Sequence, residues 1–155
     1  MKVKDIMNSP VQSCGPETNL GAAAMMMWDG DCGALPVVNF EGKVVGMITD
    51  RDICMAAATK NRPLSEITVF ETITGQVYAC APGDDIHDAM NTMAKHQVRR
   101  LPVISGTGML AGFLSMNDIV LHAGETKGRH ALAITSDDVI HAFKTIDAHR
   151  ILVGV

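Results

Sequence analysis

Two segments of the chain carry apolar residues at the spacing of one helix face. Each segment has apolar residues at positions i, i+3, i+4 and i+7, and each follows a pair of residues that commonly caps a helix. The caps are Thr18 with Asn19 and Asp84 with Asp85, and the apolar residues are Leu20, Ala23, Ala24 and Met27 in the first segment and Ile86, Ala89, Met90 and Met93 in the second. We expect an amphipathic helix in each segment.

Short apolar runs follow each expected helix. Residues 35–38 and 44–48 are joined by a polar stretch, and residues 101–104 and 110–114 are arranged in the same way around 106–108. Pairs of apolar runs joined by a few turn-forming residues are typical of β-hairpins. The second run of each pair leads into a helix that starts at Thr49 or Ser115, and we expect a short strand ahead of each first helix. Each segment therefore predicts the order β-α-β-β-α, and the first follows a short helical entry at 3–7.

The two segments are copies of one unit. An offset of 66 residues aligns residues 3–57 with residues 69–123 without a gap, and 14 of the 55 aligned positions are identical. Chance at ordinary composition would give roughly four. One unit is too short to bury its own hydrophobic face, so we expect the repeats to pack face to face about a pseudo-twofold axis. The predicted fold class is α/β (α+β), with repeat 1 at 1–57, a linker at 58–68, repeat 2 at 69–123 and an extension at 124–155.

The repeat pattern stops after residue 123. Residues 124–129 form a polar linker, and an N-cap signal and a helical apolar stripe follow it. The N-cap signal consists of Ser136, Asp137 and Asp138, and the stripe consists of Val139, Ile140, Phe143 and Ile146. We expect an added helix and a short strand at 151–153, packed on the repeats or on a second subunit.

Composition narrows the function classes. The chain has 155 residues with 47% hydrophobic and 19% charged residues, a formal net charge of −4 and a pI near 5.8. This balance is that of a folded protein without the surplus of Lys and Arg that nucleic-acid binding requires. No apolar run approaches the roughly 20 residues of a membrane span, and the N-terminus lacks a signal-peptide pattern. With four cysteines and no CxxC pair, we expect reduced thiols and a cytoplasmic location.

A hydroxyl followed three residues later by a carboxylate occurs at both strand-to-helix junctions. The pairs are Thr49 with Asp52 and Ser115 with Asp118. Such a pair forms a capping box, which satisfies free backbone donors at a helix N-terminus. A carboxylate at that place, beside a glycine that lets the backbone come close, can also accept both hydrogens of a ribose diol. The two interpretations are compatible, and the capping interpretation is the simpler one.

Only repeat 2 has basic residues just before its first hairpin strand. Arg99 and Arg100 occupy the positions of Gly33 and Ala34 in repeat 1. Arginine suits the forked recognition of phosphate, although a pair of arginines is more often simply solvated. Here the two residues lead through a proline-containing turn into a core strand, so the backbone that carries their side chains is held in place.

Together these residues resemble a known family. Two β-α-β-β-α repeats, each with a Leu-Pro-Val strand and a Gly-x-x-Thr/Ser-x-x-Asp junction, are similar to a tandem pair of cystathionine-β-synthase (CBS) domains, the Bateman module. The resemblance covers residues 3–123. It implies a stand-alone regulatory module that binds AMP, ADP, ATP or another adenosyl compound between the repeats, signals to a partner protein by conformational linkage and often forms a homodimer. It also implies that the junction Asp contacts ribose and that basic residues meet phosphate.

Carried onto this sequence, the resemblance defines two possible clefts. The first, which we expect to bind the nucleotide, combines Met47, Thr49, Arg51, Asp52, Val77, Tyr78, Val98, Arg99, Arg100 and Pro102. The second lacks a basic residue and is expected to be empty or to take ligands of little negative charge. It combines Phe113, Ser115, Asn117 and Asp118 with Pro10, Val11, Gln12, Cys32, Gly33, Ala34 and Pro36.

Other functions have weaker signals. No nucleophile elbow, Walker loop or pair of histidines on one helical turn occurs, so we expect neither an enzyme nor a required cofactor or metal. The rival hypothesis is a redox- or metal-responsive interaction protein with Cys14, Cys32 or Cys80 as sensors. The apolar stretch at 25–28 is expected in the core or, as a second choice, at a dimer contact.

Overall fold

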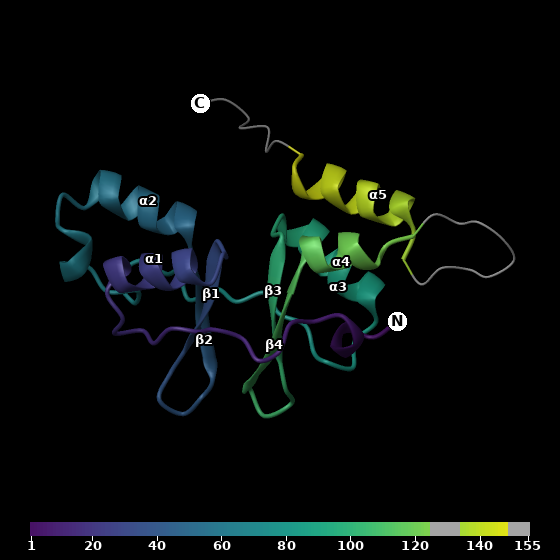
Figure 1. The fold of residues 1–155 in the computed structure, drawn as a ribbon, viewed down its shortest axis with the longest axis horizontal. Coiled ribbons are helices and arrows are strands. Elements are labelled where there is room, and N and C mark those ends of the chain that lie inside the picture. The colour runs from purple at the N-terminus through teal and green to yellow at the C-terminus, as the bar shows by residue number, and fades with distance from the viewer. Residues whose placement is uncertain (125–133, 149–155) are drawn as a thin grey trace, which may run out of the picture. The chain divides into compact units, whose positions relative to one another are not determined.

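A computed structural model describes residues 1–124 and 134–148 of the chain (Figure 1). The described residues form two compact units. The repeat-1 unit consists of residues 10–77 and 104–111, and the repeat-2 unit consists of 1–9, 78–103 and the described residues from 112 onward. The predicted α/β class is confirmed. None of the helices in the described part of the chain is long and apolar enough to cross a bilayer.

The repeat-1 unit contains a helix, a hairpin and a second helix in the predicted order. Its elements are α1 (Leu20–Asp29), β1 (Ala34–Val38), β2 (Val44–Thr49), α2 (Asp50–Thr59) and the short 3-10 helix η2 (Leu64–Glu66). The strands β1 and β2 pair antiparallel, with Ala34 opposite Thr49. Leu20, Leu35 and Ile48 are at most 1% exposed and form the centre of this core.

The repeat-2 unit repeats this arrangement and adds one helix. Its elements are the 3-10 helix η1 (Val3–Asp5), α3 (Ile86–His96), β3 (Arg100–Ile104), β4 (Leu110–Ser115), α4 (Met116–His122) and α5 (Ser136–Ile146). The hairpin tip at 104–111 is grouped with the repeat-1 unit. Asn19 and Asp85 cap α1 and α3 as predicted, since their side chains accept hydrogen bonds from backbone amides.

The strand expected ahead of each first helix is reduced to a single bridge. Cys14 pairs in parallel with Val37, and Cys80 pairs in the same way with Val103. Within the first bridge, the amide of Val38 donates to the carbonyl of Cys14 over 2.8 Å. The neighbouring Pro36 carries no N–H group and cannot extend the ladder, which explains why the pairing is so short.

Each unit is completed by residues from the start of the other repeat. Met7 lies against Gly112 in the repeat-2 unit, and Ile73 lies against Gly46 in the repeat-1 unit. A Cβ atom at Gly112 would lie 2.6 Å from the Met7 sulfur, and one at Gly46 would lie 2.5 Å from the Ile73 Cδ1 atom. These two equivalent glycines therefore leave room for the segments that contain Met7 and Ile73.

The tail helix α5 packs on the repeat-2 unit, against α3 and α4 (Figure 1). Val139, Ala142 and Ile146 are buried, whereas Ile140, which we expected in the apolar stripe, is 50% exposed. The expected N-cap is also wrong by one position, because Thr135 is the N-cap and Asp138 completes its capping box. The predicted strand at 151–153 and most of the predicted linker at 124–129 lie outside the described residues.

The apolar stretch at 25–28 is divided between core and surface. Met27 is 4% exposed, whereas Met25 and Trp28 are 58% and 81% exposed on α1. Met55 on the adjacent α2 is also half exposed. The repeat-1 unit therefore presents large apolar side chains on both of its helices.

Candidate functional site

Both strand-to-helix junctions form the predicted capping box. Thr49 Oγ1 accepts a hydrogen bond from the amide of Asp52 over 3.2 Å, and Asp52 Oδ2 accepts from the amide and the hydroxyl of Thr49 over 2.9 and 2.7 Å. Ser115 and Asp118 make the same three hydrogen bonds, over 3.3, 2.8 and 2.6 Å. The capping interpretation is thus confirmed in both repeats, and each box fixes its carboxylate at the start of a helix.

The two junction carboxylates differ in their second oxygen. Asp118 Oδ1 accepts a hydrogen bond of 2.8 Å from the side-chain amide of Asn8, which belongs to the N-terminal segment of the repeat-2 unit. Among the residues that the structure describes, nothing donates a hydrogen bond to Asp52 Oδ1. The counterpart of Asn8 in the repeat-1 unit is Thr74, whose polar side-chain atom is one bond nearer the backbone. Asp52 therefore keeps an acceptor that Asp118 has already used.

The predicted phosphate-binding arginines lie at the start of β3. The backbone carbonyl of Arg99 accepts a hydrogen bond of 2.9 Å from the amide of Met116, the first residue of α4. Its guanidinium donates to Asp147 at the end of α5 over 2.6 Å. Arg100 is half-buried, and it forms no ion pair with any described residue. Arg99 is therefore paired with a carboxylate, whereas Arg100 has no carboxylate partner among the described residues.

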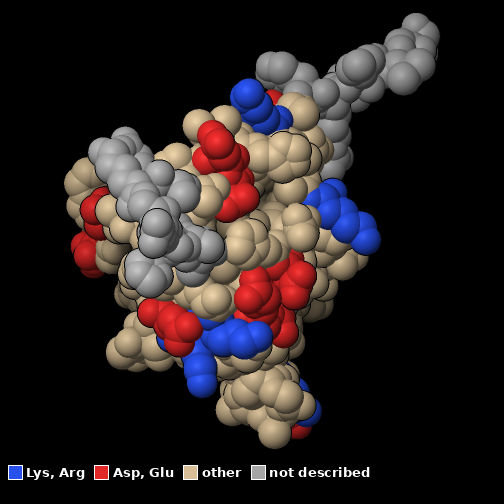
Figure 2. Space-filling model, turned by 90° about the vertical axis from the view of Figure 1, so that its right-hand side faces the viewer, with Lys and Arg blue, Asp and Glu red and all other residues tan. Residues whose placement is uncertain are grey.

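Charges of both signs are interspersed on the face that Figure 2 presents. This pattern agrees with the formal net charge of −4 and differs from the continuous basic surface of many nucleic-acid-binding proteins.

The aromatic ring of Tyr78 is stacked on His96. The ring centroids are 3.8 Å apart and the ring planes are inclined by 16°. His96 is the last residue of α3, and its counterpart in repeat 1 is Gly30. This stack holds the Tyr78 ring in place within the repeat-2 unit. The sequence gives no local sign of it, because the two residues are 18 positions apart (96 − 78) on different elements.

The residues of each predicted cleft are divided between the two units. For the first cleft, the repeat-1 unit holds Met47, Thr49, Arg51, Asp52 and Val77, and the repeat-2 unit holds Tyr78, Val98, Arg99, Arg100 and Pro102. For the second cleft, the repeat-1 unit holds Pro10, Val11, Gln12, Cys32, Gly33, Ala34 and Pro36, and the repeat-2 unit holds Phe113, Ser115, Asn117 and Asp118. Asn8, His96 and Asp147 adjoin predicted site residues and were not expected from the sequence.

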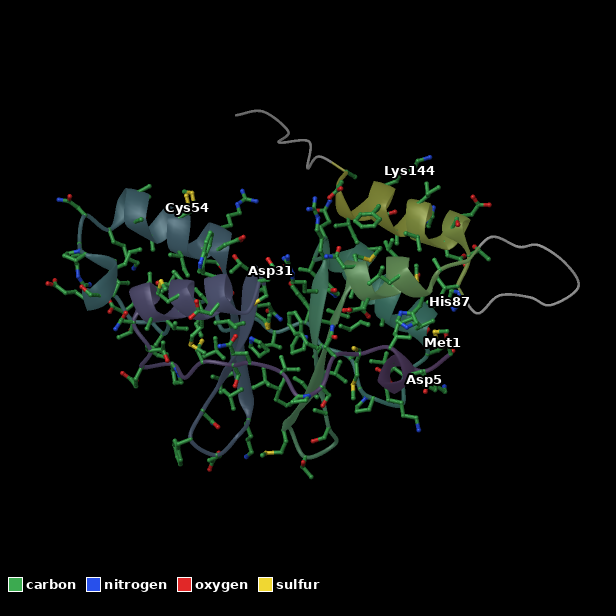
Figure 3. The ribbon with its side chains drawn as sticks, viewed as in Figure 1. Met1, Asp5, Asp31, Cys54, His87 and Lys144 are labelled. Carbon is green, nitrogen blue, oxygen red and sulfur yellow. The ribbon has the colours of Figure 1, made fainter. Side chains whose placement is uncertain are left out.

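The cysteines fall into two environments. Burial raises the pKa of Cys14 to about 11 and that of Cys80 to about 12. Both are therefore protonated near neutral pH, and thiols are poor nucleophiles and metal ligands. Cys54 is exposed on α2, where its sulfur points away from the helix (Figure 3). Across residues 1–124 and 134–148, no three His, Cys, Asp or Glu side chains are grouped so that they could hold a metal ion.

Comparison with protein families gives a match in each repeat. The CBS domain family matches residues 3–59 and 66–125. The CBS domain-containing protein YhcV of Bacillus subtilis is 34% identical over 145 residues, which cover 90% of this chain and 98% of that protein. Hypoxic response protein 1 of Mycobacterium tuberculosis is 36% identical over 122 residues, covering 79% of this chain and 85% of that protein.

Solved structures give the same result. The crystal structure of Hypoxic Response Protein I with two coordinated zinc ions matches with a TM-score of 0.72 and 35% identity, covering 79% of this chain and 98% of that one. The CBS domain pair of protein MJ0100, in complex with 5-methylthioadenosine and S-adenosyl-L-methionine, matches with a TM-score of 0.72 and 26% identity, covering 78% and 94%. With both repeats matched in sequence and the fold matched in structure, this chain belongs to the CBS domain family.

Proposed function

We propose that this chain is a regulatory module that binds an adenine nucleotide, AMP, ADP or ATP, or a related adenosyl compound. The observation that carries the proposal is the second oxygen of Asp52, which accepts no hydrogen bond from the described residues while the capping box holds its carboxylate in place. Support also comes from the CBS domain pair of MJ0100, whose crystal structure contains two adenosyl compounds.

Asp52 is the residue that we assign to the ribose. A carboxylate oxygen with free lone pairs can accept hydrogen bonds from ribose hydroxyls, and a fixed carboxylate loses little conformational freedom on binding. Asp118 is a poorer candidate, since a ligand there would have to displace the side chain of Asn8. We therefore assign the nucleotide to the set of residues that contains Asp52, with Met47, Thr49, Arg51 and Val77 contributed by the same unit.

The arginines of the repeat-2 unit are assigned to the anionic part of the ligand. Arg100 has no carboxylate partner among residues 1–124 and 134–148, and Arg99 has one exposed partner. Guanidinium groups bind phosphate through paired hydrogen bonds, so these residues favour a nucleotide over a nucleoside. Tyr78, Val98 and Pro102 supply the apolar surroundings that an adenine ring requires.

Regulation would follow from linkage. A ligand that contacts both repeats stabilises the arrangement of the repeats to which it binds more tightly. A partner protein that distinguishes the arrangements is then regulated by the same coupling free energy. This role is regulatory rather than catalytic, and the CBS family match supports it.

A panel of ligands tests the proposal by thermal unfolding. AMP, ATP, NADH, S-adenosylmethionine and Zn²⁺ are each added to the purified protein, because a ligand that binds only the folded state raises the melting temperature. We expect at least one adenosyl compound to raise it, and we expect Asp52→Asn to reduce this rise strongly. A panel in which no adenosyl compound changes the melting temperature would contradict the proposal.

The second candidate function is metal response. It is favoured by the zinc ions in the crystal structure of Hypoxic Response Protein I, which is 35% identical to this chain. The described residues argue against it, since they contain no three-ligand cluster and burial keeps two of the proposed sensor thiols protonated. A rise in melting temperature with Zn²⁺ alone would favour this second function.

Self-association is the third part of the proposal. Met25, Trp28 and Met55 are 58%, 81% and 53% exposed on α1 and α2, and large exposed apolar side chains mark interaction sites. We assign them to the contact between two copies of this chain. Light scattering on Trp28→Ser with Met55→Ser should then report a smaller mass than for the wild-type protein.

A further inference from the structure

The end of the tail helix contacts the segment that leads into β3. Arg99 Nη2 donates to Asp147 Oδ1 over 2.6 Å, and Gln97 Nε2 donates to the backbone carbonyl of Ala148 over 2.8 Å. These contacts join residues 48 and 51 positions apart within the repeat-2 unit. Both occur at the C-terminal end of α5, immediately after its last helical residue, Ile146.

Asp147 is therefore bound to the guanidinium of Arg99, which the proposed function assigns to the phosphate. Carboxylate and phosphate oxygens use the same N–H groups of an arginine, and both gain from its positive charge. A phosphate and a carboxylate that bind to the same guanidinium also repel each other. A phosphate that takes the Nη2 group, to which Asp147 Oδ1 is bound, would therefore weaken the contact of Asp147 with Arg99.

We propose that Asp147 competes with the ligand's phosphate for Arg99, so that binding of a phosphorylated adenosyl ligand releases the C-terminal end of α5. The inference rests on the proposed function and adds two features to it. Asp147 becomes a residue that determines specificity against phosphate, and the end of the tail helix becomes the part of the molecule that reports phosphate binding.

The ion pair between Arg99 and Asp147 is weak enough for a phosphate to replace it. The side chains of Arg99 and Asp147 are 58% and 49% exposed, and exposed ion pairs are weak. We expect loss of the pair to change phosphate affinity by about two- to fivefold. The rest of α5 would stay docked, since Val139, Ala142 and Ile146 are buried and Asp138 lies 3.6 Å from His87 at the other end of the helix.

The coupling between phosphate binding and the contact of Asp147 with Arg99 acts in both directions. If phosphate weakens the contact of Asp147 with Arg99, the same contact must weaken phosphate binding by the same factor. An adenosyl ligand without phosphate would leave the contact intact. AMP and adenosine should therefore differ in their effect on the end of α5, although both would use Asp52.

Titration calorimetry with AMP and adenosine on three proteins tests the inference. The proteins are the wild type, Asp147→Asn and the matched control Asp137→Asn, which removes the same charge from the exposed first turn of α5. The side chain of Asp137 makes no hydrogen bond or ion pair with any described residue. We expect Asp147→Asn to bind AMP about two- to fivefold more tightly, with AMP binding to Asp137→Asn and adenosine binding to all three proteins unchanged.

The outcomes separate the inference from the proposed function. Equal AMP affinity in the wild type and Asp147→Asn, or equal tightening in both variants, would overturn the inference and leave the proposed function standing. Failure of AMP and adenosine to bind any of the three proteins would overturn the proposed function, and the inference with it.

Amide hydrogen exchange supplies a second readout on the full chain. The amide of Asp147 donates to the carbonyl of Phe143 over 2.9 Å, so it reports whether the last turn of α5 is intact. We expect AMP to speed its exchange and adenosine to leave it unchanged. Slower exchange with AMP would contradict the release of the helix end.

Discussion

The two strand-to-helix junctions share the same capping box and differ in the hydrogen bond to the second oxygen of its carboxylate. Both capping boxes consist of the same three hydrogen bonds, and Asp52 and Asp118 occupy equivalent positions in the two repeats. Asn8 then binds the second oxygen of Asp118, whereas Asp52 has no such donor among the described residues. The comparison teaches that a duplicated unit can keep its structural role in both copies while only one copy keeps a free functional group.

The helices of the two units differ in a similar way. In the repeat-2 unit α5 packs against α3 and α4, and Met90 of α3, which is 4% exposed, belongs to the same core cluster as the buried residues of α5. The equivalent helices of the repeat-1 unit, α1 and α2, expose Met25, Trp28 and Met55. Leu121, the counterpart of Met55, is itself 80% exposed on α4. The contrast therefore lies between α1, which exposes Met25 and Trp28, and α3, which has Asn91 and Ala94 at those positions.

The cysteines give the largest expected contrast. Cys14 and Cys80 occupy equivalent buried positions, and their raised pKa values leave a thiolate fraction of roughly one in a thousand or less at pH 8. We expect both to react with a thiol reagent at least about 100-fold more slowly than the exposed Cys54 in the native protein. Mass spectrometry of the modified peptides gives the rates. Rapid modification of Cys14 or Cys80 without unfolding would favour the redox hypothesis.

The equivalent core leucines should give equal and large losses of stability. Leu35 and Leu101 are 1% and 0% exposed on β1 and β3. Truncation of a buried leucine to alanine costs about 2–5 kcal/mol, so we expect each variant to lose about 3 kcal/mol of unfolding free energy. Urea denaturation measures both. Losses that differ by more than about 2 kcal/mol would show that the two cores are not equivalent.

Replacement of Gly46 and of Gly112 with alanine should lower the free energy of unfolding by unequal amounts. A Cβ atom at Gly112 would lie 2.9 Å from the backbone carbonyl oxygen of Asn8, whereas the nearest atom to one at Gly46 is the end of the flexible Ile73 side chain. Backbone yields less easily than a side chain, so Gly112→Ala should cost about 2 kcal/mol and Gly46→Ala about 1 kcal/mol or less. Urea midpoints with unchanged m-values give the comparison. A larger loss from Gly46→Ala would contradict this packing.

Replacement of Asn8 with alanine should have the smallest effect on stability. It would leave the second oxygen of Asp118 without a hydrogen bond from Asn8, as the second oxygen of Asp52 already is without one from the described residues. The side chain of Asn8 is exposed, so Asn8→Ala should cost less than about 1 kcal/mol. It also frees Asp118 Oδ1, and we expect weak adenosine binding at Asp118 to increase. Titration of adenosine into Asn8→Ala with Asp52→Asn isolates this second site, with Asp52→Asn alone as the control. Identical binding by the two proteins would show that Asn8 does not block Asp118.

Local patterns predicted most of the fold because their causes are local. The amphipathic spacing of α1 and α3 and both capping boxes depend on residues fewer than ten positions apart, and the first hairpin pairs residues at most 15 positions apart (49 − 34). The errors arose where neighbours compete. Thr135 and Ser136 are both good N-caps, and only the hydrogen bonds with Asp138 identify Thr135. The expected first strands are shortened by prolines in the strands to which they pair.

The details of the candidate site depend on contacts that the sequence does not reveal. Asn8 reaches Asp118 across 110 positions, and Asp147 reaches Arg99 across 48. Neither pair forms a motif, because each is created when a terminal segment folds onto the repeat-2 unit. The sequence could therefore nominate the aspartates and arginines but could not tell which of them already had a partner.

The affinity for AMP of two matched variants tests the central claim most directly. Asp52→Asn and Asp118→Asn remove the same charge from equivalent capping boxes, and the amide oxygen of asparagine can still accept the hydrogen bond from the N-cap backbone amide. Calorimetry should show about a tenfold or greater loss of AMP affinity for Asp52→Asn, as expected for a hydrogen bond to a charged group, and less than about a threefold loss for Asp118→Asn. A larger loss for Asp118→Asn than for Asp52→Asn would contradict the account.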